Sequence, residues 1–221
     1  MQKLVKASFY LSISLCIVTI LVIIATYFYI KPSLPKINLV DESELQMPMK
    51  IFTKDGKLIG EFGEIKRRAT DYDDIPINIK NAFLAAEDAN FFNHQGISYK
   101  GLIRSFIRCI SSDGCVGGGG TITMQVVRGY LLTRDQTYIR KIKEIYLALE
   151  LEGNLTKEEI FELYVNRIFL GNRSYGIEAA ANTYFDKELE DLTISESATI
   201  ASLAQLPSRV NPVKDPRRKL Q

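Results

Sequence analysis

The residues best suited to chemistry are two adjacent carboxylates, Glu87 and Asp88, in the segment EDANFFNHQG. They follow the apolar run INIKNAFLAA, whose helical spacing places them at the C-terminal end of a buried helix over 77–86. The negative end of the helix dipole and the rings of Phe91 and Phe92 would both favour proton uptake there. Both effects would raise the pKa of a carboxylate there towards the range useful for a general base. The alternative is a solvated acidic turn.

Two further features lie close to these carboxylates in the sequence. The only histidine is His94, and we interpret it as a structural hydrogen-bonding residue, because one histidine without partners does not make a metal or catalytic set. The segment GGGGTITMQ over 117–125 places four glycines before a polar stretch. The glycines are either a plain flexible linker or a mobile loop beside the candidate base.

The elements that must position these residues are predicted to be mainly helical. A β-hairpin is expected over 51–62, because the segment alternates and contains Asp55-Gly56 as its turn. After it, apolar periodicity predicts helices over 77–86, 99–110, 121–132, 136–152, 157–169, 176–185 and 195–204. Three threonines have the capping-box spacing to Gln or Glu three residues later: Thr133, Thr156 and Thr193.

The helix expected over 136–152 combines apolar and charged residues. Its apolar stripe is predicted to be Ile139, Ile142, Tyr146 and Leu149. Arg140, Lys143 and Glu144 would then lie on another face, where chemistry is expected. The alternative is a solvated face on which Arg140 and Glu144 form an i,i+4 ion pair.

Length and charge limit the class of protein. The 221 residues suit one domain with a short attachment. Residues 7–30 carry no charge and are long enough to span a bilayer, and Lys3 and Lys6 before them predict a cytoplasmic N-terminus with the remaining chain outside. The formal net charge of +2 gives no strong field for binding nucleic acid.

Two of the three cysteines, Cys109 and Cys115, flank the segment ISSDG. In an extracytoplasmic, oxidising compartment we expect them to form a disulfide, worth about 2 kcal/mol from loop entropy. A zinc site is not expected, because two thiols and one distant histidine do not form a recognisable ligand set.

Taken together, four ordered motifs resemble the peptidoglycan glycosyltransferases of glycosyltransferase family 51. EDANFFNHQG and GGGGTITMQ are followed by RKIKE over 140–144 and by KEEIFELYVNRIFLGNRSYG at the start of 157–187. The resemblance covers nearly all of 62–216. It implies a mainly α fold, with a lysozyme-like lobe and a smaller membrane-associated lobe. The expected organisation is an N-terminal transmembrane anchor (1–30), a linker with a small β element (31–61), the catalytic domain (62–216) and a tail (217–221).

The resemblance also implies a reaction. Glu87 would take the proton from the 4-hydroxyl of the acceptor N-acetylglucosamine as that oxygen attacks C1 of the donor N-acetylmuramic acid, and polyprenyl pyrophosphate would leave with inversion. Glu144 is the second implied catalytic carboxylate, and would orient cations or help to hold a divalent cation (Mg²⁺ or Mn²⁺), although no cofactor is required. The implied substrate-binding residues are Asp88, Phe91, Thr123, Gln125, Arg128, Arg140, Lys141 and Lys143. Asn166 and Tyr164 would support the cleft from behind.

The implied partners are lipid II, the growing glycan strand, the membrane and other cell-wall synthesis proteins. The implied location is the bacterial cytoplasmic membrane, with a single span and an extracytoplasmic catalytic domain. A monofunctional enzyme is expected from the length.

The sequence departs from the family at Gly120, Gly129 and Gln136, where Ser, Asn and Arg are usual, and it stops before an Arg-rich fifth motif. Two alternatives therefore remain: a degenerate lipid-pyrophosphate-binding scaffold, and a lysozyme-like enzyme that cleaves glycan.

Overall fold

The computed structural model of the chain describes residues 2–35, 49–55, 57–62, 69–111, 120–132 and 138–205. The chain divides into two compact units, residues 1–36 and 37–221, which are described separately. Cys115, Gly117 to Gly119 and the Thr133–Gln136 capping box lie outside the described residues, as does the side chain of Cys109. The disulfide therefore stays a prediction.

The first unit is the helix α1 (Gln2–Ile30), followed by the short 3-10 helix η1 (Lys31–Ser33). Within the described part of the chain, Ile13–Ser33 is the one stretch of helix long and apolar enough to cross a membrane, with a mean hydropathy of 2.5. The helix agrees with the uncharged run predicted over 7–30. The direction in which it would cross stays a prediction.

The second unit begins with the predicted hairpin. Strand β1 (Met49–Phe52) pairs antiparallel with β2 (Leu58–Phe62), and the register shifts between Ile51 and Phe52. Thr53 closes the turn, because its hydroxyl accepts a hydrogen bond from the Lys57 backbone N–H at 2.9 Å and its own backbone N–H donates to the Lys57 carbonyl at 2.7 Å.

All seven predicted helices are present, with ends within two residues of the prediction wherever the chain is described, so the mainly α fold class is confirmed. In chain order the helical elements are η3 (Tyr72–Asp74), α2 (Ile77–Glu87), η4 (Phe91–Asn93), α3 (Tyr99–Ser111), α4 (Ile122–Tyr130), α5 (Tyr138–Asn154), α6 (Lys157–Arg167), α7 (Ile177–Phe185), η5 (Leu189–Asp191) and α8 (Ile194–Gln205). The capping boxes at Thr156 and Thr193 are confirmed by reciprocal hydrogen bonds with Glu159 and Glu196.

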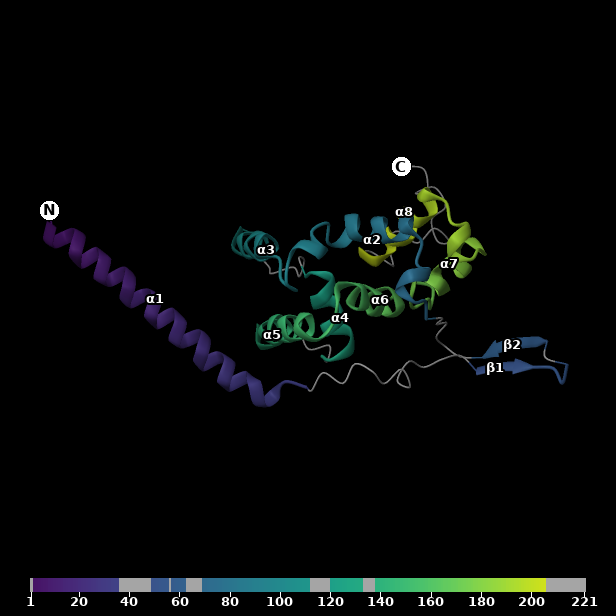
Figure 1. Cartoon of the computed structure of the whole chain (residues 1–221), viewed down its shortest axis with the longest axis horizontal. Helices are drawn as coiled ribbons and strands as arrows, with labels where there is room; N and C mark the ends of the chain where they lie inside the picture. Colours follow the sequence, from purple (N-terminus) through teal and green to yellow (C-terminus); the bar gives the residue numbers. More distant parts are fainter. Residues whose placement is uncertain are drawn as a thin grey trace. The chain divides into compact units, whose positions relative to one another are not determined.

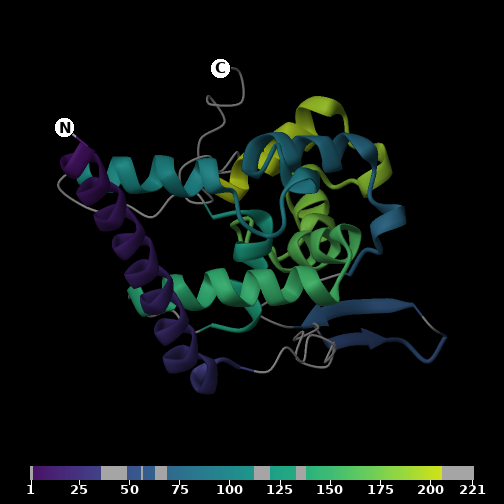
Figure 2. The same cartoon turned by 60° about the vertical axis from the view of Figure 1, so that its left-hand side comes forward.

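The helices pack so that α2 lies along α8, while α4 packs against both α5 and α6 (Figures 1 and 2). The predicted buried face of α2 is confirmed at Ile79 and Phe83, both fully buried. Val127 of α4 and Phe161 of α6 belong to the same apolar core. Helix α4 contains the TITMQ segment, so the packing of α4 against α5 and α6 holds that segment against the apolar core.

The predicted apolar stripe of α5 is wrong. Ile139 is 51% exposed and Leu149 is 43% exposed. The buried positions share a different face of the helix: Glu144, Leu147, Ala148 and Leu151. The helix carries two apolar stripes, and packing against α4 buries the one that includes a carboxylate. Glu144 is therefore a buried residue and not part of a solvated polar face.

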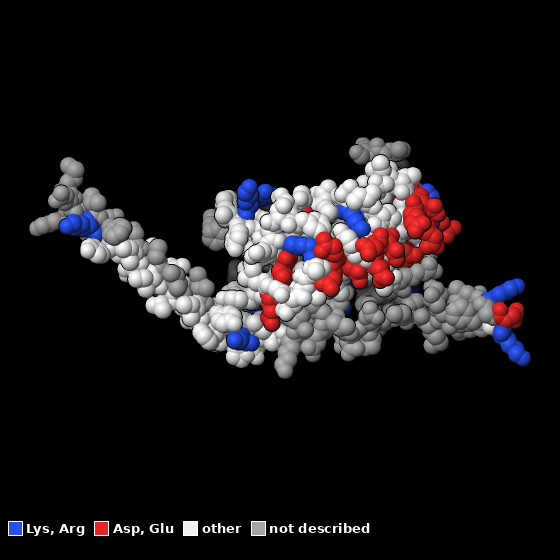
Figure 3. Space-filling view, in the orientation of Figure 1, with Lys and Arg blue, Asp and Glu red and all other residues white. Residues whose placement is uncertain are grey.

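Acidic side chains gather on one side of the second unit (Figure 3). Asp73 in η3 and Glu158 in α6 are both exposed and lie close enough to act on Tyr72. Burial raises the pKa of Tyr72 above its usual value, and the negative charges of Glu158 and Asp73 raise it further.

Candidate active site

Glu87 is the last residue of α2, where the sequence placed it, and its carboxylate is half-buried. Gln125 from α4 holds one of its oxygens: the amide Nε2 donates a hydrogen bond to Glu87 Oε2 at 2.7 Å. The other oxygen, Oε1, is buried and has no hydrogen-bond partner among the described residues. A carboxylate with one fixed and one unsatisfied oxygen is oriented and can still accept a proton.

Tyr164 from α6 lies behind this carboxylate. Its ring packs edge-on against Phe83, which precedes Glu87 by one helical turn, with 6.0 Å between ring centroids. Burial raises the pKa of the Tyr164 hydroxyl well above its usual value, the charge of Glu87 raises it further, and Arg128 acts in the opposite direction. The hydroxyl therefore keeps its proton and remains a hydrogen-bond donor at neutral pH.

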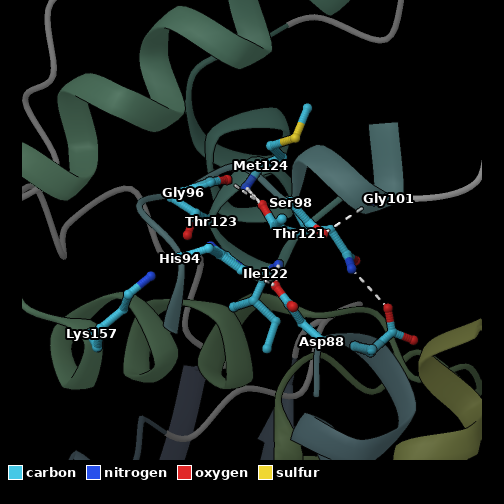
Figure 4. Close-up of polar contacts among 12 residues, drawn as sticks. Asp88, His94, Gly96, Ser98, Gly101, Thr121, Ile122, Thr123, Met124 and Lys157 are labelled. Atoms are coloured by element: carbon cyan, nitrogen blue, oxygen red, sulfur yellow. Dashed lines mark hydrogen bonds and ion pairs between the residues drawn. The ribbon is translucent and has the colours of Figure 1, made fainter. Parts of the chain in front are cut away.

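Asp88 faces the protein interior and accepts two hydrogen bonds. His94 Nε2 lies 2.9 Å from Asp88 Oδ2, and the backbone N–H of Ile122 donates to the same oxygen at 3.2 Å (Figure 4). Ile122 is the first residue of α4, so Asp88 binds a free donor at the positive end of that helix. The predicted hydrogen-bonding role of His94 is confirmed, and Asp88 ties the end of α2 to the start of α4.

Thr121 fixes the same junction from the other side. Its hydroxyl donates to the Gly96 carbonyl at 2.6 Å and accepts from the Met124 backbone N–H at 3.2 Å, so it caps α4 (Figure 4). Gly96 has φ +75°, and a Cβ there would lie 2.9 Å from the Ala148 carbonyl oxygen of α5. Only glycine allows the chain after Glu87 to pass this close to α5.

Two residues predicted to bind substrate are fully buried in this structure. The Thr123 hydroxyl donates to Glu152 Oε1 at 2.5 Å, and Lys157 Nζ pairs with the same oxygen at 2.6 Å. The Phe91 ring is also buried, with Lys157 Nζ 4.4 Å from its centroid. Thr123 therefore joins α4 to α5 and α6, Phe91 packs on α6, and neither residue presents exposed surface to a ligand.

A second charged cluster is built on α5. Glu144 is 1% exposed, and its two oxygens face two cations: Arg140 Nε at 3.3 Å from Oε1 and Lys141 Nζ at 2.9 Å from Oε2. The Arg140 side chain is 20% exposed and its Nε is buried, whereas the Lys141 side chain is 44% exposed. Lys141 therefore presents a positive charge to solvent, as anion binding requires, beside a largely buried Arg140.

The predicted alternative that Glu144 holds a divalent cation does not fit this geometry. Both of its oxygens point at positively charged side chains, which would repel a metal ion. Within the described residues, His, Cys, Asp and Glu form no group of three that could bind a metal. The residues around Glu144 suit an anion.

The start of α4 connects the two carboxylate clusters. A Cβ built on Gly120 would lie 4.0 Å from Lys141 Nζ, and Gln125, five residues later, contacts Glu87. Arg128, one turn further along α4, is exposed and acts electrostatically on Tyr164. Lys143 is half-buried on α5, and its place in a site stays a prediction. The structure thus brings the candidate base, a polar amide and an outward-facing cation together around one helix.

Asn166 ties the end of α6 to the chain before η3, and its support of the cleft stays a prediction. Its amide makes a reciprocal pair with Thr70: Thr70 N–H donates to Oδ1 and Nδ2 donates to the Thr70 carbonyl, both at 2.9 Å. Gly176, with φ +84°, lies against the same turn, because a Cβ there would approach the Asn166 carbonyl oxygen to 3.0 Å. These contacts fix the C-terminal end of α6, the helix that carries Tyr164.

Sequence reasoning did not identify three residues that organise the site. Thr121 precedes the apolar run of α4, so the preference of helix N-caps for threonine could have indicated its capping role. No sequence pattern indicated the roles of Glu152 and Lys157, because their contacts with Thr123 join three different helices. Such a contact depends on the tertiary fold alone.

Comparison with known proteins identifies the family. Residues 55–221 match the family model described as Transglycosylase. Penicillin-binding protein 1A of Pseudomonas aeruginosa is 45% identical over 220 residues, which is 100% of this chain and 27% of that protein. Penicillin-binding protein 1A of Haemophilus influenzae is 46% identical over 201 residues, covering 91% of this chain and 22% of that protein.

A crystal structure of penicillin-binding protein 1A from Haemophilus influenzae is also similar, with 34% identity over 79% of this chain and 16% of that chain. Its TM-score of 0.40 is too low to establish a shared fold. The chain spans about a quarter of the length of the curated relatives it matches. It belongs to the transglycosylase family, as its four motifs predicted.

Proposed function

We propose that this chain is a peptidoglycan glycosyltransferase that polymerises a lipid-linked disaccharide with Glu87 as general base. Membership of the transglycosylase family supports the class of reaction. The observation that carries the proposal is that Glu87 and Lys141 both lie next to the N-terminal part of α4. Gln125 donates a hydrogen bond to Glu87, and a Cβ built on Gly120 lies 4.0 Å from Lys141 Nζ. The base would serve the attacking hydroxyl and the cation the departing phosphate.

In the proposed reaction the carboxylate of Glu87 takes the proton of the acceptor's sugar hydroxyl. The oxygen forms a bond to the anomeric carbon of the donor sugar, and the bond from that carbon to the pyrophosphate breaks with inversion. The hydrogen bond from Gln125 supports this role, since it fixes the carboxylate without neutralising it. General base catalysis typically contributes a factor of about 10² to 10⁴.

The leaving pyrophosphate carries the electrons of the broken bond as negative charge, so it requires cations and not a strong acid. Arg140 and Lys141 are proposed to bind it, because Glu144 orients both and Lys141 presents its charge to solvent. Arg128 is proposed to contribute from α4, where it is exposed. Each such contact to a charged group contributes about 1.5 to 3 kcal/mol.

The proposed location is the outer face of the cytoplasmic membrane, where a lipid-linked sugar is found. The apolar helix α1 supports membrane attachment by length and composition. A second observation is the exposed apolar stripe of α3, where Tyr99, Ile103 and Ile107 recur every four residues and are 74%, 61% and 58% exposed. Lys100 and Arg104 are exposed beside that stripe, a pattern typical of helices that lie on anionic membranes.

The test is to incubate the purified full-length chain in detergent or vesicles with labelled lipid-linked disaccharide. Polymer is the expected product, and its formation should disappear in Glu87→Gln, which retains the side-chain shape without a basic oxygen. Shortened glycan as the product would indicate a lysozyme-like hydrolase. Lipid that binds with no conversion by the unmodified chain would indicate a scaffold and overturn the proposed activity.

A further inference from the structure

The hydroxyl group of Tyr164 is a buried polar group with no structural explanation. The residue is 3% exposed, and its hydroxyl has no hydrogen-bond partner among the described residues. A phenylalanine would fill the same space against Phe83 and Phe161, and would avoid burying an unsatisfied donor. Since the ring alone satisfies the packing, the hydroxyl requires another role.

The unsatisfied oxygen of Glu87 is the matching acceptor. Oε1 is buried without a partner, while Oε2 is bound by Gln125. Tyr164 packs against Phe83, one turn before Glu87 on the same side of α2, and the charge of Glu87 acts on the Tyr164 hydroxyl. A buried donor and a buried acceptor in the same region are each costly alone, and both are satisfied if they share one ordered water.

We propose that Tyr164 is a positioning residue for Glu87. Its hydroxyl supplies the buried oxygen of the carboxylate with the donor it lacks through one ordered water. Gln125 and Tyr164 would then hold the two oxygens from α4 and α6, and the carboxylate could not rotate while it takes the proton of the acceptor. This inference rests on the proposed function, because it assigns Tyr164 to the base of that reaction.

The choice of donor is chemically specific. Gln125 and Tyr164 are both neutral, so each can orient the carboxylate without placing a positive charge beside it. Burial keeps the pKa of the Tyr164 hydroxyl well above its usual value, so the group does not lose its proton to the carboxylate or to solvent at neutral pH. It remains a donor through the catalytic cycle.

The test compares Tyr164→Phe with the unmodified full-length chain in the lipid-linked disaccharide assay, with kcat and KM measured separately. Removing one water-mediated hydrogen bond to a charged group should lower kcat about 10- to 100-fold, with KM little changed because no substrate contact is lost. The acidic limb of the pH profile of kcat should also move, since the variant changes the surroundings of the base. The melting temperature should stay within about 4 °C of the parent.

The matched control is Tyr184→Phe, which removes a hydroxyl that donates to the Leu170 carbonyl at 2.8 Å, outside the site. It should lower the melting temperature slightly and leave kcat and the pH profile unchanged. One outcome would overturn the inference alone: the chain polymerises, Glu87→Gln is inactive, and Tyr164→Phe matches the parent in kcat and in pH profile. Tyr164 would then act only through its ring, and the proposed function would still stand. If the unmodified chain makes no polymer, both fail together.

Discussion

Replacing Lys141 by methionine tests whether the cluster on α5 binds pyrophosphate or only stabilises the fold. The substitution keeps most of the length of the side chain and removes an ammonium group that lies 2.9 Å from Glu144 Oε2. Glu144 retains Arg140 as a partner, so the buried carboxylate is not left without a cation. The variant should therefore fold.

The substitution is expected to change two quantities, the affinity for the pyrophosphate and the stability of the fold. A charge-assisted contact to phosphate contributes about 1.5 to 3 kcal/mol, and because the Lys141 side chain is 44% exposed we take the lower value, which is about a tenfold rise in Kd. Because Glu144 is 1% exposed, losing the hydrogen bond to its Oε2 should cost about 1 to 3 kcal/mol, which lowers the melting temperature by about 2 to 12 °C. Raising the ionic strength should reduce the difference in Kd between parent and variant.

The assay measures binding of a fluorescent polyprenyl pyrophosphate in micelles, with the uncharged polyprenol as the ligand control. Lys187→Met is the matched protein control, since Lys187 pairs with Glu196 at the same 2.9 Å, is 36% exposed and lies far along the chain from α5. It should lose less stability, because Glu196 is more exposed than Glu144, and no affinity. If Lys141→Met also binds the pyrophosphate lipid within about twofold of the parent, the reasoning is refuted and Lys141 is a structural partner of Glu144.

Three further changes test the site and the stability of the fold. Gln125→Leu removes the donor 2.7 Å from Glu87 Oε2 and should lower kcat about tenfold in the polymerisation assay, with an unchanged circular dichroism spectrum. Gly96→Ala forces a Cβ to 2.9 Å from a carbonyl oxygen of α5 at φ +75°, and should reduce the free energy of unfolding by about 1 to 3 kcal/mol in urea titration. The pKa of Glu196 is lowered to about 2, mainly by the backbone hydrogen bond from Thr193. Because this pKa is below the value of 4.5 expected in the unfolded chain, Glu196 stabilises the fold above about pH 4.5, and this stabilisation is lost as the pH falls through about 2. Glu196→Gln should remove that part of the pH dependence of the melting temperature.

The positions of the helices could be predicted because their signals are local. The Thr156 and Thr193 caps each depend on residues three apart in the sequence, and apolar periodicity gave the helices between them. The end of α2, and so the position of Glu87, followed from the same pattern. A helix that ends in a carboxylate can be identified from the sequence without knowledge of its neighbours.

The buried face of α5 could not be predicted in this way. The helix has one apolar stripe through Ile139 and Leu149 and a second through Leu147 and Leu151, and the periodicity does not favour either. The choice depends on α4, which packs on the stripe that contains Glu144. The same limit applies to Tyr164, whose hydroxyl matters only because α6 brings it behind a carboxylate from α2.

The most direct test of the central claim is the single-turnover rate of sugar transfer by Glu87→Gln at saturating lipid-linked disaccharide. The amide retains the shape of the side chain but cannot take the proton, so the rate should fall by about 10² to 10⁴ while lipid binding and the melting temperature remain close to the parent values. A variant that transfers sugar within about threefold of the parent rate would contradict the assignment of Glu87 as the base.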